Sequence, residues 1–107
     1  MVEITAEDYN QANAKWFKDH QEDIEPLTNN IQAMPEGEMK KLENHEIAAI
    51  NGSEDDFNKF VELVKKYKLI LPRKANENFR NSFAAEHHKL VDKFVEKYYS
   101  ALVYEGK

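Results

Sequence analysis

Residues 53–67 read SEDDFNKFVELVKKY, and this stretch decides the fold class. Its apolar side chains at Phe57, Phe60 and Val64 recur every three or four positions, while lysines and a glutamate fall on the opposite side of a helix. Ser53 precedes the pattern and has the chemistry of a helix N-cap. The stretch therefore predicts an amphipathic helix whose apolar face must pack against other elements.

The rest of the chain carries the same helical signal. All three glycines and all three prolines fall between periodic segments or at their ends, where helix boundaries place them. Thr5 and Asp8 resemble a capping box, and Asn51-Gly52 is typical of a helix end that turns left-handed. The expected helices span about residues 6–21, 24–34, 36–51, 53–67 and 75–103.

The last of these segments keeps its apolar period from Phe79 to Leu102. A continuous helix over residues 75–103 would be about 43 Å long at ~1.5 Å per residue, and we expect it to form either the spine of a bundle or a protruding arm. The only run that favours a strand, Lys68–Leu71, is too short to form a sheet alone. The sequence therefore predicts an all-α fold, a compact bundle of four or five helices with a long C-terminal helix, in a single domain over residues 1–107.

Length and composition exclude several classes of protein. The chain has 107 residues, 41% of them hydrophobic and 33% charged, which suits one soluble domain with one core. Because it has no cysteine, it has no disulfide, no thiolate zinc site and no cysteine nucleophile, and it fits a reducing compartment. No apolar run approaches the ~18 residues of a membrane span, and the N-terminus does not resemble a signal peptide. We therefore expect a cytoplasmic protein.

Charge is distributed unevenly along the chain. Residues 1–56 carry 14 acidic residues against 4 lysines, whereas residues 57–107 carry 6 acidic residues against 11 lysines and arginines. The acidic run 54–56 opens the best-defined helix, and residues 65–74 hold five cations and no acid. One interpretation is that these charges are solvated faces, helix caps or attractions between the two halves. The other is that the acidic face or the basic stretch binds a partner.

Three aromatic residues, Phe17, Tyr99 and Tyr104, fall outside the apolar stripes. Exposed aromatic side chains often dominate the binding energy of an interface. Tyr99 and Val103 also suggest a second apolar face on the last helix, through which the chain could form a homodimer. The candidate partner-binding residues are Glu54, Asp55, Asp56, Lys65, Lys66, Lys68, Arg73, Lys74 and Tyr99.

The stretch 65–74 interleaves its cations with apolar residues, a pattern also found where proteins contact nucleic acid backbone or an anionic membrane. The net charge of −5 and the narrow basic footprint argue against both ligands. Residues 69–71 are then an anchor that packs the turn onto the core. The expected partner is another protein.

The search for catalytic and metal-binding motifs is negative. The sequence has no phosphate loop, no dinucleotide glycine motif, no Gly-x-Ser-x-Gly and no His-Glu-x-x-His, and no cofactor is expected. His88 and Asp92 have the spacing of two metal ligands on one helix face, but two ligands do not make a site, so no metal is expected. The leading hypothesis is a non-catalytic interaction module that binds, inhibits or protects another macromolecule.

A second hypothesis starts from three polar residues on apolar helix faces, Glu46, Arg80 and His87. His87 is expected to be buried, either as a hydrogen-bonded neutral imidazole or as a ligand or pH sensor. A buried Glu46 would need a partner, and we expect that partner to be Arg80 or His87. The alternative function is therefore a bundle that binds a small ligand or metal at an internal site near these three residues. That site requires a cavity, whereas the interaction module requires a solid core and a contiguous surface patch.

Overall fold

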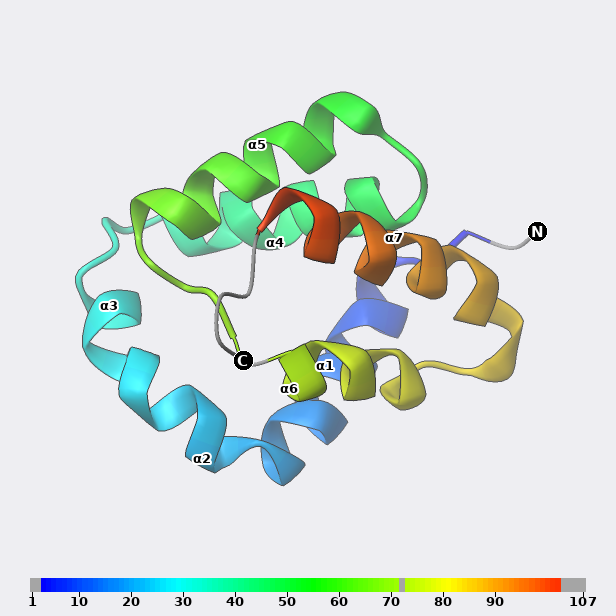
Figure 1. Ribbon diagram of the computed structural model, residues 1–107, viewed down its shortest axis with the longest axis horizontal. Helices are drawn as coiled ribbons and strands as arrows, with labels where there is room; N and C mark the ends of the chain where they lie inside the picture. Colours follow the sequence, from blue (N-terminus) through cyan, green and yellow to red (C-terminus); the bar gives the residue numbers. More distant parts are fainter. Residues whose placement is uncertain (1–2, 72, 103–107) are drawn as a thin grey trace.

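The computed structural model describes residues 3–71 and 73–102, which fold almost entirely into helices (Figure 1). No strand occurs among these residues, so the all-α prediction is confirmed. The elements in chain order are α1 (Ala6–Asp19), α2 (Gln21–Ile24), η1 (Glu25–Leu27), α3 (Thr28–Gln32), α4 (Glu38–Ile50), α5 (Glu54–Lys66), α6 (Arg73–Phe79), η2 (Arg80–Ser82), η3 (Ala85–His87) and α7 (His88–Ala101), where η marks a 3₁₀ helix.

Helix α1 begins at the predicted capping box. The Thr5 hydroxyl accepts a hydrogen bond from the Asp8 N–H at 3.1 Å, and Asp8 Oδ2 accepts one from the Thr5 N–H at 3.0 Å. The helix predicted over residues 6–21 ends earlier, at Asp19, because the backbone of His20 leaves the helical region with φ −124° and ψ 30°. The chain turns at this residue and starts α2.

The helix predicted over residues 24–34 is divided into short turns. Pro26 lies in the first turn of η1, where its missing N–H is tolerated, and α3 ends at Gln32, ahead of Pro35. Figure 1 shows α2, η1 and α3 as an arc at the lower left that leads from α1 to α4. Helices this short are not stable in isolation, so packing against the rest of the protein must hold the arc in place.

Helices α4 and α5 form an antiparallel pair joined by a tight turn (Figure 1). The turn is a Schellman motif, in which the Gly52 N–H donates to the Ala49 carbonyl and the Ser53 N–H donates to the Ala48 carbonyl, both at 3.0 Å. Gly52 has φ +112°, a conformation that glycine adopts without strain. The predicted helix end at Asn51-Gly52 is confirmed.

The C-terminal region contains both a confirmed and a wrong prediction. A long C-terminal helix is present, since α7 has 14 residues, as many as α1. Its predicted start at residue 75 is wrong, because Phe83 and Ala84 adopt extended conformations that separate α6 and η2 from η3 and α7. A straight helix of ~43 Å would exceed the 36 Å longest dimension of the protein, whereas the break lets both halves pack on one core.

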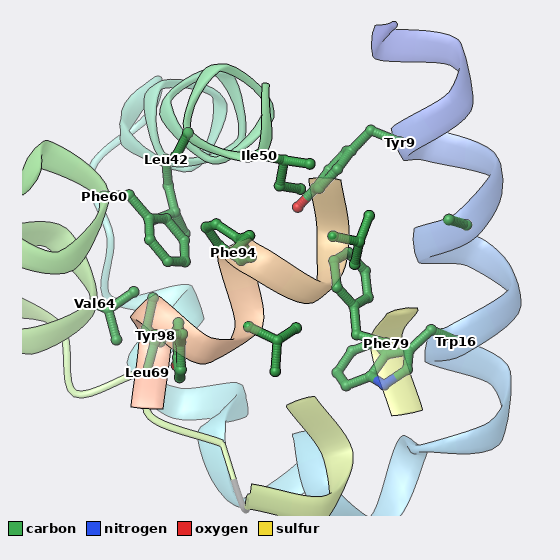
Figure 2. Packing of buried hydrophobic residues seen from close by; sticks show 14 of the residues in the cluster. Tyr9, Trp16, Leu42, Ile50, Phe60, Val64, Leu69, Phe79, Phe94 and Tyr98 are labelled. Atoms are coloured by element: carbon green, nitrogen blue, oxygen red, sulfur yellow. The ribbon is translucent and has the colours of Figure 1, made fainter. Parts of the chain in front are cut away.

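One hydrophobic core lies between α1 on one side and the α4–α5 pair on the other, with α6 and α7 between them (Figure 2). Aromatic side chains fill much of it. Phe94 on α7 packs between Phe57 and Phe60 of α5, with ring centroids 5.9 and 5.5 Å apart, and Phe79 packs edge-on against Trp16 at 5.8 Å. The apolar stripe that predicted α5 therefore faces this core.

The end of α5 holds a strained residue that a glycine would relieve. Lys68 has φ +55° at the position where Gly52 ends α4, and the Leu69 N–H donates to the Val64 carbonyl at 2.9 Å across it. A left-handed backbone conformation costs an L-residue about 1 to 2 kcal/mol, and glycine avoids this cost. Part of the gain is offset, because glycine has more conformational freedom in the unfolded chain and loses more of it on folding. We expect Lys68→Gly to raise the free energy of unfolding by about 1 kcal/mol, measured by urea denaturation.

The reverse substitution at the matched turn is the control. Gly52→Ala places a Cβ at φ +112°, in open space but in a strained backbone, and should lower the free energy of unfolding by at least about 1 kcal/mol. If Lys68→Gly destabilised the protein, the left-handed conformation of Lys68 would not be the source of strain that we infer.

Candidate functional site

The acidic run at the start of α5 is largely occupied by contacts within the chain. Glu54 accepts a hydrogen bond from Lys97 Nζ at 2.6 Å, which lowers the pKa of Glu54. Asp56 accepts a hydrogen bond from the Ser53 hydroxyl at 2.6 Å and pairs with His45 Nδ1 at 2.8 Å, and these contacts lower the pKa of Asp56. Of the three, Asp55 alone has no such side-chain partner among the described residues. Capping and ion pairing therefore explain most of this run.

Five basic residues lie at the end of α5, in the turn that follows it and at the start of α6. We call Lys65, Lys66, Lys68, Arg73 and Lys74, together with the segment that joins them, the basic turn. None of the five cations forms an ion pair with an acidic side chain in the part of the chain that the structure describes. All five are exposed to solvent.

The apolar residues of the basic turn point in different directions. Leu69 is buried and Leu71 is partly buried, so these two residues anchor the turn to the core as predicted. Ile70 between them is 40% exposed, which is unusual for a large apolar side chain in this protein. The turn therefore presents an apolar residue among its cations.

Tyr99 is not the freely exposed aromatic that the sequence suggested. Its ring is partly buried, lies 4.7 Å from the Arg73 guanidinium carbon and donates a hydrogen bond from its hydroxyl to the Arg73 carbonyl at 2.9 Å. Tyr99 therefore joins α7 to the start of α6. Phe17, by contrast, is 46% exposed, as predicted. Val103 and Tyr104 lie outside the described residues.

The three polar residues expected to form an internal site do not meet. Arg80 is exposed and its Nη1 lies 3.4 Å from Asp92 Oδ1. His87 is buried as predicted, with its Nε2 3.5 Å from Asp8 Oδ2 and 3.6 Å from Glu86 Oε1. The expected pairing of Glu46 with Arg80 or His87 is wrong, because Arg80 pairs with Asp92 on α7 and His87 lies beside Asp8 and Glu86.

Glu46 instead faces a tyrosine on α1. The Tyr9 hydroxyl donates a hydrogen bond to Glu46 Oε1 at 2.5 Å, and Tyr9 itself is buried. Enclosure of the carboxyl by protein atoms raises the pKa of Glu46 from 4.5 to about 7, against the opposing effect of the tyrosine hydrogen bond. Burial and the nearby Glu46 carboxylate raise the pKa of Tyr9.

Glu46 also lines a hollow of about 330 Å³ between α1, α4 and α5, which we call the central hollow. Its lining is mostly apolar and aromatic and includes Trp16, Phe60, Val64 and Tyr98. Figure 2 shows Trp16 on the α1 side of the core and the other three on the opposite side. The arc from α2 to α3 closes one side, and Leu69 and Leu71 of the basic turn close another. The hollow is partly open to solvent, and the exposed Phe17 is among its lining residues.

The two metal-ligand candidates on α7 have other contacts. A ring nitrogen of His88 lies 3.1 Å from the Phe83 carbonyl, and Asp92 pairs with Arg80. Within residues 3–71 and 73–102, no group of three or more histidines and carboxylates is placed to hold a metal ion. No helix in this part of the chain combines the length and apolarity needed to cross a bilayer.

Sequence reasoning did not find the roles of two polar residues in this region. Asn51 was recognised only as a helix end, but its side-chain amide forms hydrogen bonds with both backbone groups of Ile4, at 2.8 and 2.9 Å, and so joins the segment before α1 to the end of α4. Glu43, one turn before Glu46, also lines the central hollow. The i, i+3 spacing of the two glutamates is the sequence signal that could have identified them as a pair.

Comparison of the chain with protein-family models, with curated proteins and with solved structures finds no match. The proposals below therefore rest on the geometry and charge of this chain.

Proposed function

We propose that this protein is a non-catalytic interaction module that binds an acidic segment of another protein through the basic turn. The observation that carries the proposal is the group of five exposed cations at residues 65–74, none of which pairs with an acidic side chain among the described residues. Uncompensated charge of one sign steers association with a surface of the opposite sign. An acidic partner segment supplies that surface.

The basic turn is a better interface candidate than the acidic run 54–56. Binding a cationic partner at Glu54 and Asp56 would compete with contacts to Lys97, Ser53 and His45 that already exist. Binding at the basic turn breaks no ion pair that the described residues form. Ile70 adds an apolar contact that loses its exposure to water on binding, so the favoured partner segment combines acidic residues with an apolar side chain.

Protein is favoured over nucleic acid or an anionic membrane as the partner. The chain has a net charge of −5, and the 14 acidic residues of its first 56 repel a polyanion that extends beyond the basic turn. A short acidic segment of a protein avoids that repulsion. We further propose the cytoplasm as the compartment, because the chain has no cysteine. A homodimer through α7 stays a prediction that light scattering at two concentrations tests.

Photo-cross-linking from the basic turn tests the proposal. With p-benzoylphenylalanine in place of Ile70, irradiation in a lysate of the native host should attach a protein through a segment rich in Asp and Glu, identified by mass spectrometry. The Lys65→Glu/Lys66→Glu double variant should reduce the yield at least about tenfold, since each lost charge contact is worth about 1 kcal/mol. Raising the salt to about 0.5 M should weaken capture as well.

Two controls separate a specific interface from general charge effects. Glu54→Lys/Asp55→Lys reverses the same number of charges at the other end of α5 and should leave the yield at position 70 unchanged. The cross-linker at the exposed Asn44 on α4 should not capture the same protein. The proposal is contradicted if no acidic segment is attached at position 70, if both charge reversals act equally, or if the attached molecule is nucleic acid or lipid.

A further inference from the structure

The central hollow has the shape and lining of a site for a small, mostly apolar molecule. Its volume of about 330 Å³ is at the lower end of the ~300–1,000 Å³ range of ligand pockets, which suits a molecule of about ten non-hydrogen atoms. Trp16, Phe17 and Phe60 offer aromatic surface to the body of such a molecule. A few polar groups then decide what its head group must be.

The polar lining of the hollow is acidic. Among the described residues, no lysine, arginine or histidine lines the hollow, whereas Glu43 and Glu46 both do, from successive turns of α4. The other titratable groups in the lining are the hydroxyls of Tyr9 and Tyr98, and α5 and α6 contribute only uncharged side chains to it. An anionic head group would be repelled by two carboxylates at this site, and a cationic one would be attracted.

Glu46 has an oxygen available for a ligand. The Tyr9 hydroxyl occupies Oε1, while Oε2 makes no hydrogen bond with the described residues. No buried side-chain oxygen or nitrogen in the described part of the chain is without a hydrogen-bond partner, so Oε2 must be accessible. A carboxylate oxygen accepts a charge-assisted hydrogen bond from an ammonium group, and such a bond is stronger where the surroundings are apolar.

We propose that the central hollow binds a small amphiphilic amine, whose ammonium group donates to Glu46 Oε2 and whose apolar body packs against Trp16 and Phe60. Glu43 adds negative potential next to the ammonium group. A metal ion fits the hollow poorly, because two carboxylates are too few ligands and the apolar lining would stay uncovered. The inference does not rest on the proposed protein partner, since Lys65 and Lys66 do not line the hollow.

Three ligands that share one tail test the choice of head group. The probes are n-octylammonium, n-octanol and octanoate, with affinity measured by calorimetry and the site reported by the fluorescence of Trp16, the only tryptophan in the chain. Octylammonium should bind at least about tenfold more tightly than octanol, and octanoate should bind most weakly. Equal affinities, tighter binding of octanoate, or no response of Trp16 to any probe would overturn the proposal.

Glu46→Gln tests the residue without removing the tyrosine contact, because the glutamine carbonyl still accepts a hydrogen bond from Tyr9. It should weaken octylammonium binding about tenfold and leave octanol binding unchanged. Glu62→Gln, at an exposed position on α5, removes the same charge outside the hollow and should change neither affinity. Equal loss of octanol binding in Glu46→Gln would indicate a damaged hollow rather than a lost ion pair, and would contradict the assignment of Glu46.

The pH dependence of octylammonium affinity also tests the role of Glu46. If Glu46 had only a structural role, this affinity would not follow its protonation state. Because the pKa of Glu46 is about 7, its charged form increases between pH 6 and 8, while an alkylammonium with a pKa near that of lysine, about 10.4, stays protonated. Affinity for octylammonium should therefore rise across this range in the parent protein and stay flat in Glu46→Gln. A pH-independent affinity in the parent protein would contradict the role of Glu46.

Discussion

Replacing Phe94 by alanine is expected to lower the free energy of unfolding by about 4 kcal/mol. Phe94 is 4% exposed and packs its ring against Phe57, Phe60 and Tyr98, so the substitution removes contacts on several sides. These partners come from α5 and from α7 itself and cannot all close the cavity that the ring leaves. Urea denaturation followed by circular dichroism measures the loss, which is a large part of the 5–15 kcal/mol typical of a domain.

Two further substitutions make the Phe94 result interpretable. Phe17→Ala removes the same atoms from a ring that is 46% exposed, and should lower the free energy of unfolding by less than about 1 kcal/mol. Phe94→Leu keeps most of the buried volume and should cost less than about 1.5 kcal/mol, so it gives a folded variant if Phe94→Ala is unfolded. Similar losses for Phe94→Ala and Phe17→Ala would show that α7 does not form the centre of the core.

The features of the fold that the sequence predicted well are those that depend on residues close together in the chain. The apolar period of α5, the Thr5 capping box and the left-handed Gly52 each depend on residues within about one helical turn of one another. Such signals do not depend on tertiary contacts, and they identified the helix type and most boundaries to within two or three residues.

The break at Phe83 and Ala84 had no such local signal. Neither residue is a glycine or proline, and the apolar period continues across them because Phe79, Phe83 and Val91 all face the core. The two halves of the segment bury those side chains from different directions, which a single helix axis cannot do. The break therefore depends on the size of the core, which is a tertiary property that the periodicity of apolar residues does not indicate.

For charged residues too, the sequence predicted the position on a helix but not the partner, which lies far away in the chain. The sequence correctly marked Glu46 as a carboxyl on an apolar helix face, but its partner is Tyr9, 37 residues away, rather than a cation. The sequence also identified an acidic run and a basic run, but it did not indicate which of the two forms ion pairs within the protein. The contact of Glu54 with Lys97, 43 residues later, shows why: long-range ion pairs leave no pattern in a single sequence.

The free energy of unfolding should decrease as the pH rises from about 4.5 to 7, because Glu46 becomes ionised over this range. Its pKa is about 7 in the folded protein and near 4.5 when unfolded, so the unfolded chain releases this proton first and becomes relatively more favourable as the pH rises. The stabilisation is therefore complete below about pH 4.5 and lost above about pH 7. A shift of this size corresponds to ~3 kcal/mol, which we reduce to about 2 kcal/mol because the hollow is open to water.

Glu46→Gln does not titrate, so it should remove this pH dependence and keep the hydrogen bond from Tyr9. Near pH 4.5 the variant and the parent protein should have similar free energies of unfolding, and at pH 8 the variant should be more stable by about 2 kcal/mol. All other ionisable side chains are the same in both proteins, so their contributions cancel in the difference. Urea denaturation at pH 4.5, 6, 7 and 8 measures it, with Glu62→Gln as the control for loss of one surface charge. A difference between variant and parent that stays constant from pH 4.5 to 8 would show that Glu46 has the same pKa in both states, and that the carboxyl is solvated rather than enclosed.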